Sequence, residues 1–103
     1  MKPCPPTIDG CRVICYAPID ERHRFTGNCK QVVDGRLMGA MAGLAIAQYD
    51  GATGFYLFGC DADWECVTDT LHQTLDDAKC QAEFEYEGVS QTWIDASKFF
   101  DGG

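Results

Sequence analysis

Basic residues are scarce in this sequence. It has eight Lys and Arg residues against 16 Asp and Glu residues, which gives a net charge of −8 at pH 7 and a pI of about 4.4. Proteins bind nucleic acids largely by neutralising phosphates with Lys and Arg, and anionic membranes attract basic segments. We therefore expect no nucleic-acid partner and no membrane partner. The acid excess can serve solubility alone, or it can attract a basic protein partner.

Long apolar runs are also missing. No segment approaches the length of about 20 residues that a transmembrane helix needs. The first residues, Met1 to Pro6, lack the apolar core of a secretory signal peptide. We therefore expect a cytoplasmic protein whose seven cysteines are reduced. Three of these cysteines stand where small core residues are expected, because free cysteine is often buried: Cys15, Cys60 and Cys66.

The usual metal-binding patterns are incomplete. Structural zinc sites use paired Cys-x2–4-Cys knuckles, and only Cys11 and Cys15 have such spacing. On one strand these two residues would share a face about 13 Å apart, which is too far to hold one ion. The acids between Asp61 and Glu65 alternate as in a calcium loop, but the central glycine and distal glutamate are missing. We expect no metal and no cofactor.

The stretch from Gly54 to Gly88 organises the chain. Its first part predicts a hairpin: an aromatic strand from Phe55 to Phe58, a loop over residues 59–63, and a second strand from Trp64 to Thr70. Apolar residues on both faces of the first strand predict a central strand covered on both sides. The cover could be a helix on one face and a partner subunit on the other.

The second part predicts one amphipathic helix over Leu75–Glu87. Thr74 is the expected N-cap with Asp77 three residues on, and Gly88 is the expected C′ residue. Phe84 projects from the face opposite the core stripe, so it either folds onto Val89 or marks a protein contact. The core stripe at helical spacing consists of Leu75, Ala78, Ala82, Tyr86 and Val89.

The remaining chain completes an α+β fold: an antiparallel sheet of four to five strands with this one main amphipathic helix packed on one face. Residues 1–10 hold three prolines and are expected to form a flexible N-terminal arm before a single domain over residues 11–100. The further predicted segments are a strand over Cys11–Tyr16, a strand over Phe25–Val33 with a turn or bulge at Gly27-Asn28, a turn at Asp34-Gly35, a loop or bulged strand over Leu37–Ala42, and a strand over Gly43–Tyr49 paired with Gly54–Cys60.

Few residues have a pattern that indicates chemistry. Asp69 could orient His72 as in acid–base sites, or both could simply satisfy the turn before the helix. The acids around His72 oppose activation of a nearby cysteine, so we assign no catalytic residue. A ligand pocket, if present, would be lined by Tyr16, Tyr56, Trp64, Asp69 and His72. An interface, if present, would use Phe84, Trp93, Phe99 and Phe100, and we expect a homodimer.

The second half also resembles a type of small uncharacterised bacterial protein. The matching features are DTLHQT at Asp69–Thr74, EFEYEG at Glu83–Gly88, and the following Trp93. Proteins of this type look like accessory genes of mobile cassettes or neighbours of toxin genes. The resemblance implies a shared fold, and it brings no activity and no catalytic residue.

These observations leave three hypotheses for function. The first is a small acidic binding protein with a basic protein partner, for example in an immunity or antitoxin role. The second is a small-molecule-binding protein or enzyme with a pocket between helix and sheet or at a dimer interface. The third is a structural component of a larger assembly.

Overall fold

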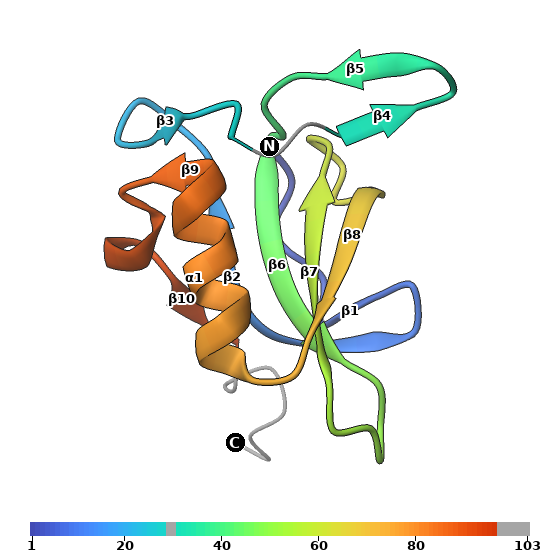
Figure 1. Ribbon diagram of the computed structural model, residues 1–103. Helices are drawn as coiled ribbons and strands as arrows, with labels where there is room; N and C mark the ends of the chain where they lie inside the picture. Colours follow the sequence, from blue (N-terminus) through green and yellow to red (C-terminus); the bar gives the residue numbers. More distant parts are fainter. Residues whose placement is uncertain (29–30, 97–103) are drawn as a thin grey trace.

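The computed structural model describes residues 1–28 and 31–96, and its elements are arranged around one curled sheet (Figure 1). In chain order they are β1 (Thr7–Ile8), β2 (Cys11–Pro18), β3 (Arg24–Phe25), β4 (Gln31–Val33), β5 (Arg36–Met38), β6 (Gly43–Gln48), β7 (Phe55–Cys60), β8 (Cys66–His72), α1 (Leu75–Glu85), β9 (Tyr86–Glu87), the 3-10 helix η1 (Val89–Gln91) and β10 (Ile94–Asp95). The predicted α+β class is confirmed.

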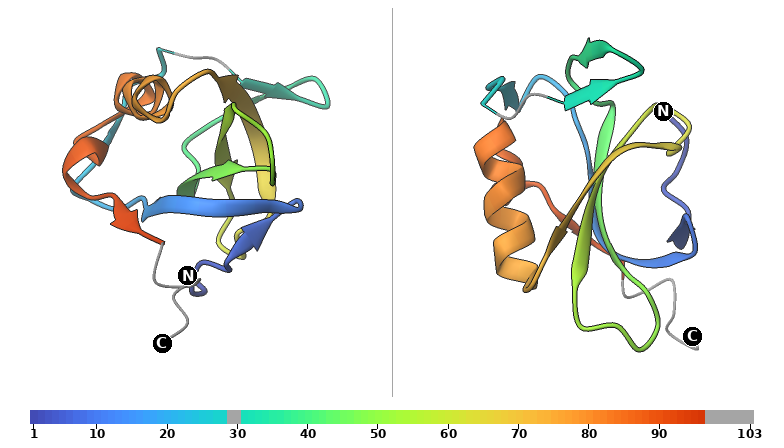
Figure 2. Two further views of the ribbon diagram at one scale, coloured as in Figure 1. Left: turned by 90° about the horizontal axis from the view of Figure 1, so that it is seen from below. Right: turned by 45° about the vertical axis from the view of Figure 1, so that its right-hand side comes forward.

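The main sheet is antiparallel with the order β1-β2-β6-β7-β8. β10 also pairs with β2, at Tyr16 and Cys15, whereas β1 pairs with the start of the same strand. The sheet thus has six strands, more than the four to five expected from the sequence. Seen end-on in Figure 2, it curls strongly. At one end of the sheet the short strands β1 and β10 pair with the outer side of β2. At the other end the edge strand is β8.

Two buried clusters lie on opposite faces of β6 and β7. β6 alternates between them, since Ala45 and Ala47 belong to one cluster and Leu44 and Ile46 to the other. The helix-side cluster consists of Cys15, Ala17, Leu44, Ile46, Leu57, Ala78, Ala82, Tyr86 and Val89. The N-terminal-side cluster consists of Cys4, Ile8, Cys11, Val13, Ala45, Ala47, Phe58, Cys60, Trp64 and Ala96.

The N-terminal segment, residues 1–8, forms part of the N-terminal-side cluster. Cys4 and Ile8 are buried, β1 pairs with β2, and Lys2 donates its N–H to the carbonyl of Ala62 at 3.2 Å. The sequence predicts a flexible arm here and a partner subunit over this face of the aromatic strand. In the structure the chain's own first residues cover the face, so burial of both faces of β7 does not require a second copy.

A bulge in β2 explains a further difference. The register with β6 shifts between Val13 and Cys15, so the side chains before and after the shift enter different clusters. Cys11 lies in the N-terminal-side cluster and Cys15 in the helix-side cluster. The expectation that Cys11 and Cys15 share one face is therefore wrong, although both are buried.

The predicted hairpin is confirmed as β7 and β8, but its loop covers residues 61–65, so Trp64 lies in the loop and not at the start of the second strand. The predicted pairing of residues 43–49 with residues 54–60 is confirmed as β6 and β7. The strand expected over Phe25–Val33, with a turn or bulge at Gly27-Asn28, is not one strand but two short ones, β3 and β4, which pair with different partners. β3 pairs with β9 beyond the helix, and β4 pairs with β5 in a separate hairpin. The predicted Asp34-Gly35 turn joins that hairpin, with φ of 51° and 77°, as such two-residue turns require.

The helix begins as predicted. Thr74 adopts extended backbone angles, and its Oγ1 accepts the N–H of Asp77 at 3.0 Å. The helix ends at Glu85, two residues before the expected end, because Tyr86 and Glu87 enter β9. Gly88 has a φ of 98° but precedes η1 instead of closing a Schellman motif. Val89 is buried, whereas Phe84 is 53% exposed.

Candidate functional site

The open edge of the sheet is the strand β8, Cys66–His72. Six of its seven residues pair with β7 on one side, and Val67 is skipped at a bulge. On the other side the strand pairs with no strand among residues 1–28 and 31–96. Natural sheets commonly protect such an edge with proline, lysine, a covering segment or a very short strand. β8 contains neither proline nor lysine, although it has a bulge at Val67 and one charged residue, Asp69. Its pairing with β7 is regular from Thr68 to His72. This edge is therefore suited to pairing with another chain.

The ladder shows which backbone groups face outward. The carbonyl of Cys60 accepts the N–H of Ala42, so Cys60 directs its backbone toward β6. By alternation, Gly59, Leu57 and Phe55 direct theirs toward β8. Their partners are Thr68, Thr70 and His72. It follows that Asp69 and Leu71 present their N–H and C=O groups at the open edge, and the Leu71 side chain is 61% exposed.

The sequence segment that contains this strand is acidic. Residues 61–77 contain six acidic residues and no Lys or Arg. Asp61 is used locally, because its Oδ1 accepts the N–H groups of Asp63 and Glu65 in the hairpin loop. Asp63 also pairs with Lys2 at 3.3 Å. The segment as a whole still places a strong negative field beside an unpaired strand edge.

The ligand residues expected from the sequence do not converge on one pocket. Trp64 is buried and meets Tyr16 edge to face, with ring centroids 5.7 Å apart. Thr70 Oγ1 lies 2.8 Å from His72 Nε2, whereas Asp69 lies an odd number of residues from His72 and so projects from the other face of β8. The hypothesis that Asp69 orients His72 is therefore not supported.

Two of the expected ligand residues do share an open groove. Tyr56 and His72 line it together with Leu71 and the turn at residues 51–54, and its volume is about 880 Å³. Tyr49 also lines it and meets Tyr56 edge to face at 5.7 Å. We did not expect Tyr49 from the sequence, since it follows an ambiguous alanine-rich segment.

A cavity also lies between the end of α1 and the sheet, where the sequence places its alternative pocket. The buried carboxylate of Glu85 lines it with Thr68 and Thr70, and Glu85 accepts a hydrogen bond from Gln81 Nε2 at 2.9 Å. Its volume of about 20 Å³ accommodates a water molecule rather than a substrate. Glu85 belongs to the EFEYEG motif, and nothing in that motif predicted that this glutamate would be buried.

Most other residues of the EFEYEG motif shape the turn after α1. The Glu83 carboxylate accepts the N–H groups of Gly88 and Ser90 at 2.9 and 3.0 Å. Burial would raise the pKa of Glu83, but these hydrogen bonds outweigh it and the pKa is lowered. The Tyr86 hydroxyl accepts the N–H of Met41, and Glu87 pairs with Arg24 at 2.8 Å. These contacts explain the motif as part of the fold.

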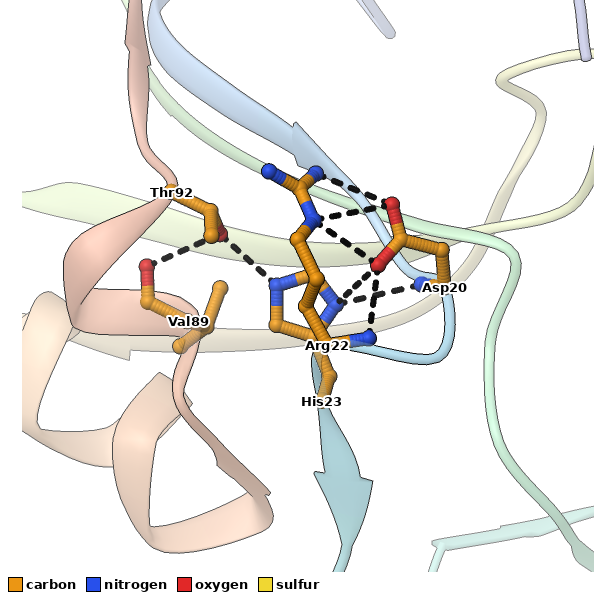
Figure 3. A network of polar contacts seen from close by, with 5 residues as sticks. All are labelled: Asp20, Arg22, His23, Val89 and Thr92. Atoms are coloured by element: carbon orange, nitrogen blue, oxygen red, sulfur yellow. Dashed lines mark hydrogen bonds and ion pairs between the residues drawn. The ribbon is translucent and has the colours of Figure 1, made fainter.

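His23 is likewise held in a structural network (Figure 3). Its Nδ1 accepts the N–H of Asp20 at 3.1 Å, so the ring proton is on Nε2, which donates to Thr92 Oγ1 at 2.7 Å. Thr92 in turn donates to the carbonyl of Val89. The side chain of His23 is fully buried. This chain of bonds ties the turn after β2 to η1 and leaves the imidazole no free nitrogen.

Four of the described cysteines show no sign of nucleophilic activation. Burial raises the pKa of Cys4 to about 12 and the pKa values of Cys15 and Cys66 to about 11. The pKa of Cys60 is raised as well, mainly by burial. Thiolates are therefore rare at neutral pH at these positions, whereas catalytic cysteines have lowered pKa values.

Two of the four expected interface residues, Phe84 and Trp93, lie in the part of the chain that the structure describes. Phe84 is exposed on the outer face of α1, and Trp93 packs against the helix-side cluster. The indole N–H of Trp93 is buried and has no hydrogen-bond partner among the described residues. Phe99 and Phe100 lie outside the described residues. A homodimer interface built from these four side chains stays a prediction.

Neither a metal site nor a membrane span is found in the part of the chain that the structure describes. No three side chains among its His, Cys, Asp and Glu residues gather closely enough to hold an ion. Its helices are too short or too polar to cross a bilayer. No protein-family model matches the chain, and neither a curated protein nor a solved structure matches it. Function must therefore be argued from the geometry alone.

Proposed function

We propose that this chain is a small acidic binding protein that pairs its β8 edge with an extended, basic segment of a protein partner. The observation that carries the proposal is a seven-residue edge strand, bulged at Val67, whose outer side pairs with no strand among residues 1–28 and 31–96. It lies inside a 17-residue segment with six acids and no base. An immunity or antitoxin role against a basic protein is one form of this proposal. The free thiols of the six described cysteines suit a cytoplasmic location, which we include in it.

Strand addition explains how such a surface could bind. Main-chain hydrogen bonds to the outward groups of Asp69 and Leu71 supply affinity, and alternate side chains supply specificity. The negative field raises the rate of encounter with a basic partner. We include in the proposal that α1 covers one face of the sheet, since Ala78 and Ala82 share a cluster with Leu57 of β7. Among the described residues that arrangement leaves the outer side of β8 without a paired strand.

A second copy of the chain is the competing occupant of this edge. Two copies would bring together two acidic segments and two net charges of −8, which repel each other at close range. Like charges directly opposite across a strand pair are destabilising. We therefore favour a basic partner at β8 over self-pairing, and we leave the homodimer expected from Phe84 and Trp93 as a separate proposal.

The test uses a synthetic extended peptide of alternating Lys and Val and a control of the same sequence with alternate backbone nitrogens methylated. Both carry the same charge, but the control cannot complete a ladder. We expect the first peptide to bind more tightly by about tenfold, because two backbone hydrogen bonds contribute about 0.5–1.5 kcal/mol each. Calorimetric titration at about 0.01 M salt, where screening is weak, measures both affinities.

Two variants separate backbone pairing from charge. Asp69→Pro removes an outward N–H without removing a bond to β7, and Asp69→Ala removes only the carboxylate. We expect Asp69→Pro to weaken binding of the unmodified peptide beyond the effect of Asp69→Ala. Equal affinities for the two peptides, together with equal effects of the two variants, would mean that charge alone acts and that β8 is not the binding edge.

A second candidate function rests on the groove at Tyr49, Tyr56 and His72. Its volume lies within the range of about 300–1,000 Å³ that is usual for small-molecule sites. Two tyrosine rings and an imidazole could bind a small planar ligand. Native mass spectrometry of freshly purified protein distinguishes this candidate, because a retained small molecule would appear as extra mass that Tyr56→Ala removes.

A further inference from the structure

Four cysteines gather on the face of the sheet that the N-terminal segment covers. Cys4, Cys11 and Cys60 are buried in the N-terminal-side cluster, and Cys66 packs against it. They come from the N-terminal segment, β2, β7 and β8, so the fold brings together thiols that are up to 62 residues apart in sequence. They do not form a metal site within the described residues, and the binding edge proposed above does not use them.

One pair within this group lies in disulfide register. Cys60 and Cys66 are directly opposite each other across the β7–β8 hairpin. Cys60 directs its carbonyl to Ala42 on the β6 side, and the neighbouring pair is bonded through Asp61 N–H to the carbonyl of Glu65. Cys60 and Cys66 are thus a non-hydrogen-bonded pair, for which the Cα separation is about 4.5 Å. Disulfides span Cα separations of about 4.4–6.8 Å.

The two thiols differ in access. Cys60 is fully buried, whereas Cys66 is partly exposed and its Sγ lies 3.4 Å from the carbonyl oxygen of Thr68. A dissolved oxidant therefore reaches Cys66 first, and Cys60 is placed behind it to resolve the product. Redox-sensitive cysteines are typically accessible, beside a second thiol and low in pKa. This pair has the access and the second thiol, whereas burial raises the pKa of Cys66.

We propose that Cys60 and Cys66 form a redox-modification site that accepts a small-molecule disulfide such as oxidised glutathione. The Cys66 thiolate attacks one sulfur of the reagent, the reagent's S–S bond breaks, and one glutathione thiolate leaves. The Cys60 thiolate then attacks Cys66 Sγ and displaces the second glutathione. The protein dithiol is oxidised by two electrons and loses two protons, which the two departing thiolates take up, and one glutathione disulfide is reduced to two thiols.

The surroundings make this oxidation slow at neutral pH. Besides burial, Asp9, in the turn between β1 and β2, and Asp69, on the same strand as Cys66, raise the pKa of Cys66 and so oppose its thiolate. Asp9 and Asp61 likewise raise the pKa of Cys60, and so does Cys4 when it is ionised. Since burial raises the pKa of Cys66 to about 11, its thiolate fraction grows about tenfold per pH unit below that value. The reaction is thus expected to accelerate from pH 7 to pH 9.

The test treats the full chain with oxidised glutathione at pH 9, without denaturant, in a Cys80→Ser background that removes an exposed thiol. Intact mass and peptide mapping after alkylation identify the products. We expect a linkage between Cys60 and Cys66 and a loss of two hydrogens. Cys66→Ser abolishes the linkage, and the matched control Cys15→Ser, which alters a buried thiol of the helix-side cluster, retains it.

Circular dichroism of both serine variants confirms that each is folded before oxidation. A linkage from Cys60 to Cys4 or from Cys66 to Cys11 would overturn the assignment of the pair. A stable glutathione adduct on Cys66 that never transfers to Cys60 would overturn it as well, because the opposed geometry would then fail to bring the two sulfurs together. Neither result depends on whether β8 binds a partner.

Discussion

Replacing Trp64 with alanine is expected to lower the free energy of unfolding by about 3–5 kcal/mol, the usual cost of removing a large aromatic side chain from a core. The side chain is 3% exposed, although it stands in a hairpin loop with a φ of 62°. Its ring lies against Gly43, where an added Cβ would be 2.7 Å from it, and its Nε1–H donates to the carbonyl of Lys2 at 2.6 Å. Trp64 therefore holds the N-terminal segment on the sheet.

Urea unfolding followed by circular dichroism measures this loss. Trp64→Phe is the matched control, since it keeps an aromatic ring and loses the donor, and it should cost clearly less than Trp64→Ala. Alkylation of the buried Cys4 should also become faster in Trp64→Ala, because the segment that carries it is released. A loss below about 1 kcal/mol, the size of an ordinary surface effect, would contradict the core role of Trp64 and restore it as a ligand-binding candidate.

Replacing Gly88 with alanine is expected to destabilise the fold by about 1–3 kcal/mol through backbone strain, with a steric clash in addition. The φ of Gly88 is 98°, which L side chains rarely adopt. An added Cβ would also lie 2.7 Å from the carbonyl oxygen of Arg22. Because that carbonyl belongs to the turn after β2, the clash would separate this turn from the end of the helix.

Gly51→Ala is the matched control for this prediction. Gly51 also has a positive φ, 78°, but an added Cβ there would meet nothing within 4 Å. The difference between the two free energies of unfolding therefore reports the contact with Arg22 alone. Equal losses in Gly88→Ala and Gly51→Ala would indicate that the turn after β2 does not pack against Gly88.

The sequence correctly predicted those elements that depend on a few adjacent residues. The N-cap at Thr74, the turn at Asp34-Gly35 and the β7–β8 hairpin each depend on a few adjacent residues, and each is found as expected. The helix end was misjudged because Tyr86 and Glu87 leave the helix to pair with β3, a partner about 60 residues away in sequence. Tertiary pairing of this kind overrides helix propensity and is invisible in the local sequence.

Nonlocal features account for most of what sequence reasoning missed at the candidate site. The bulge in β2 places Cys11 and Cys15 in different clusters, and no residue type in the strand indicates a bulge. The strand at β8 was predicted, but its position at the edge follows from the order of the whole sheet. The burial of Trp64 was not foreseen for a similar reason, because the segment that covers it lies at the start of the chain.

Amide hydrogen exchange along β8 tests the central claim most directly. If β8 is an open edge, the amides of Asp69 and Leu71 exchange rapidly in the free protein, whereas those of Thr70 and His72, which face β7, are protected. Addition of the Lys-Val peptide should then protect Asp69 and Leu71. Slow exchange of both amides in the free, monomeric protein would contradict the account, because the edge would already be covered and unavailable to a partner.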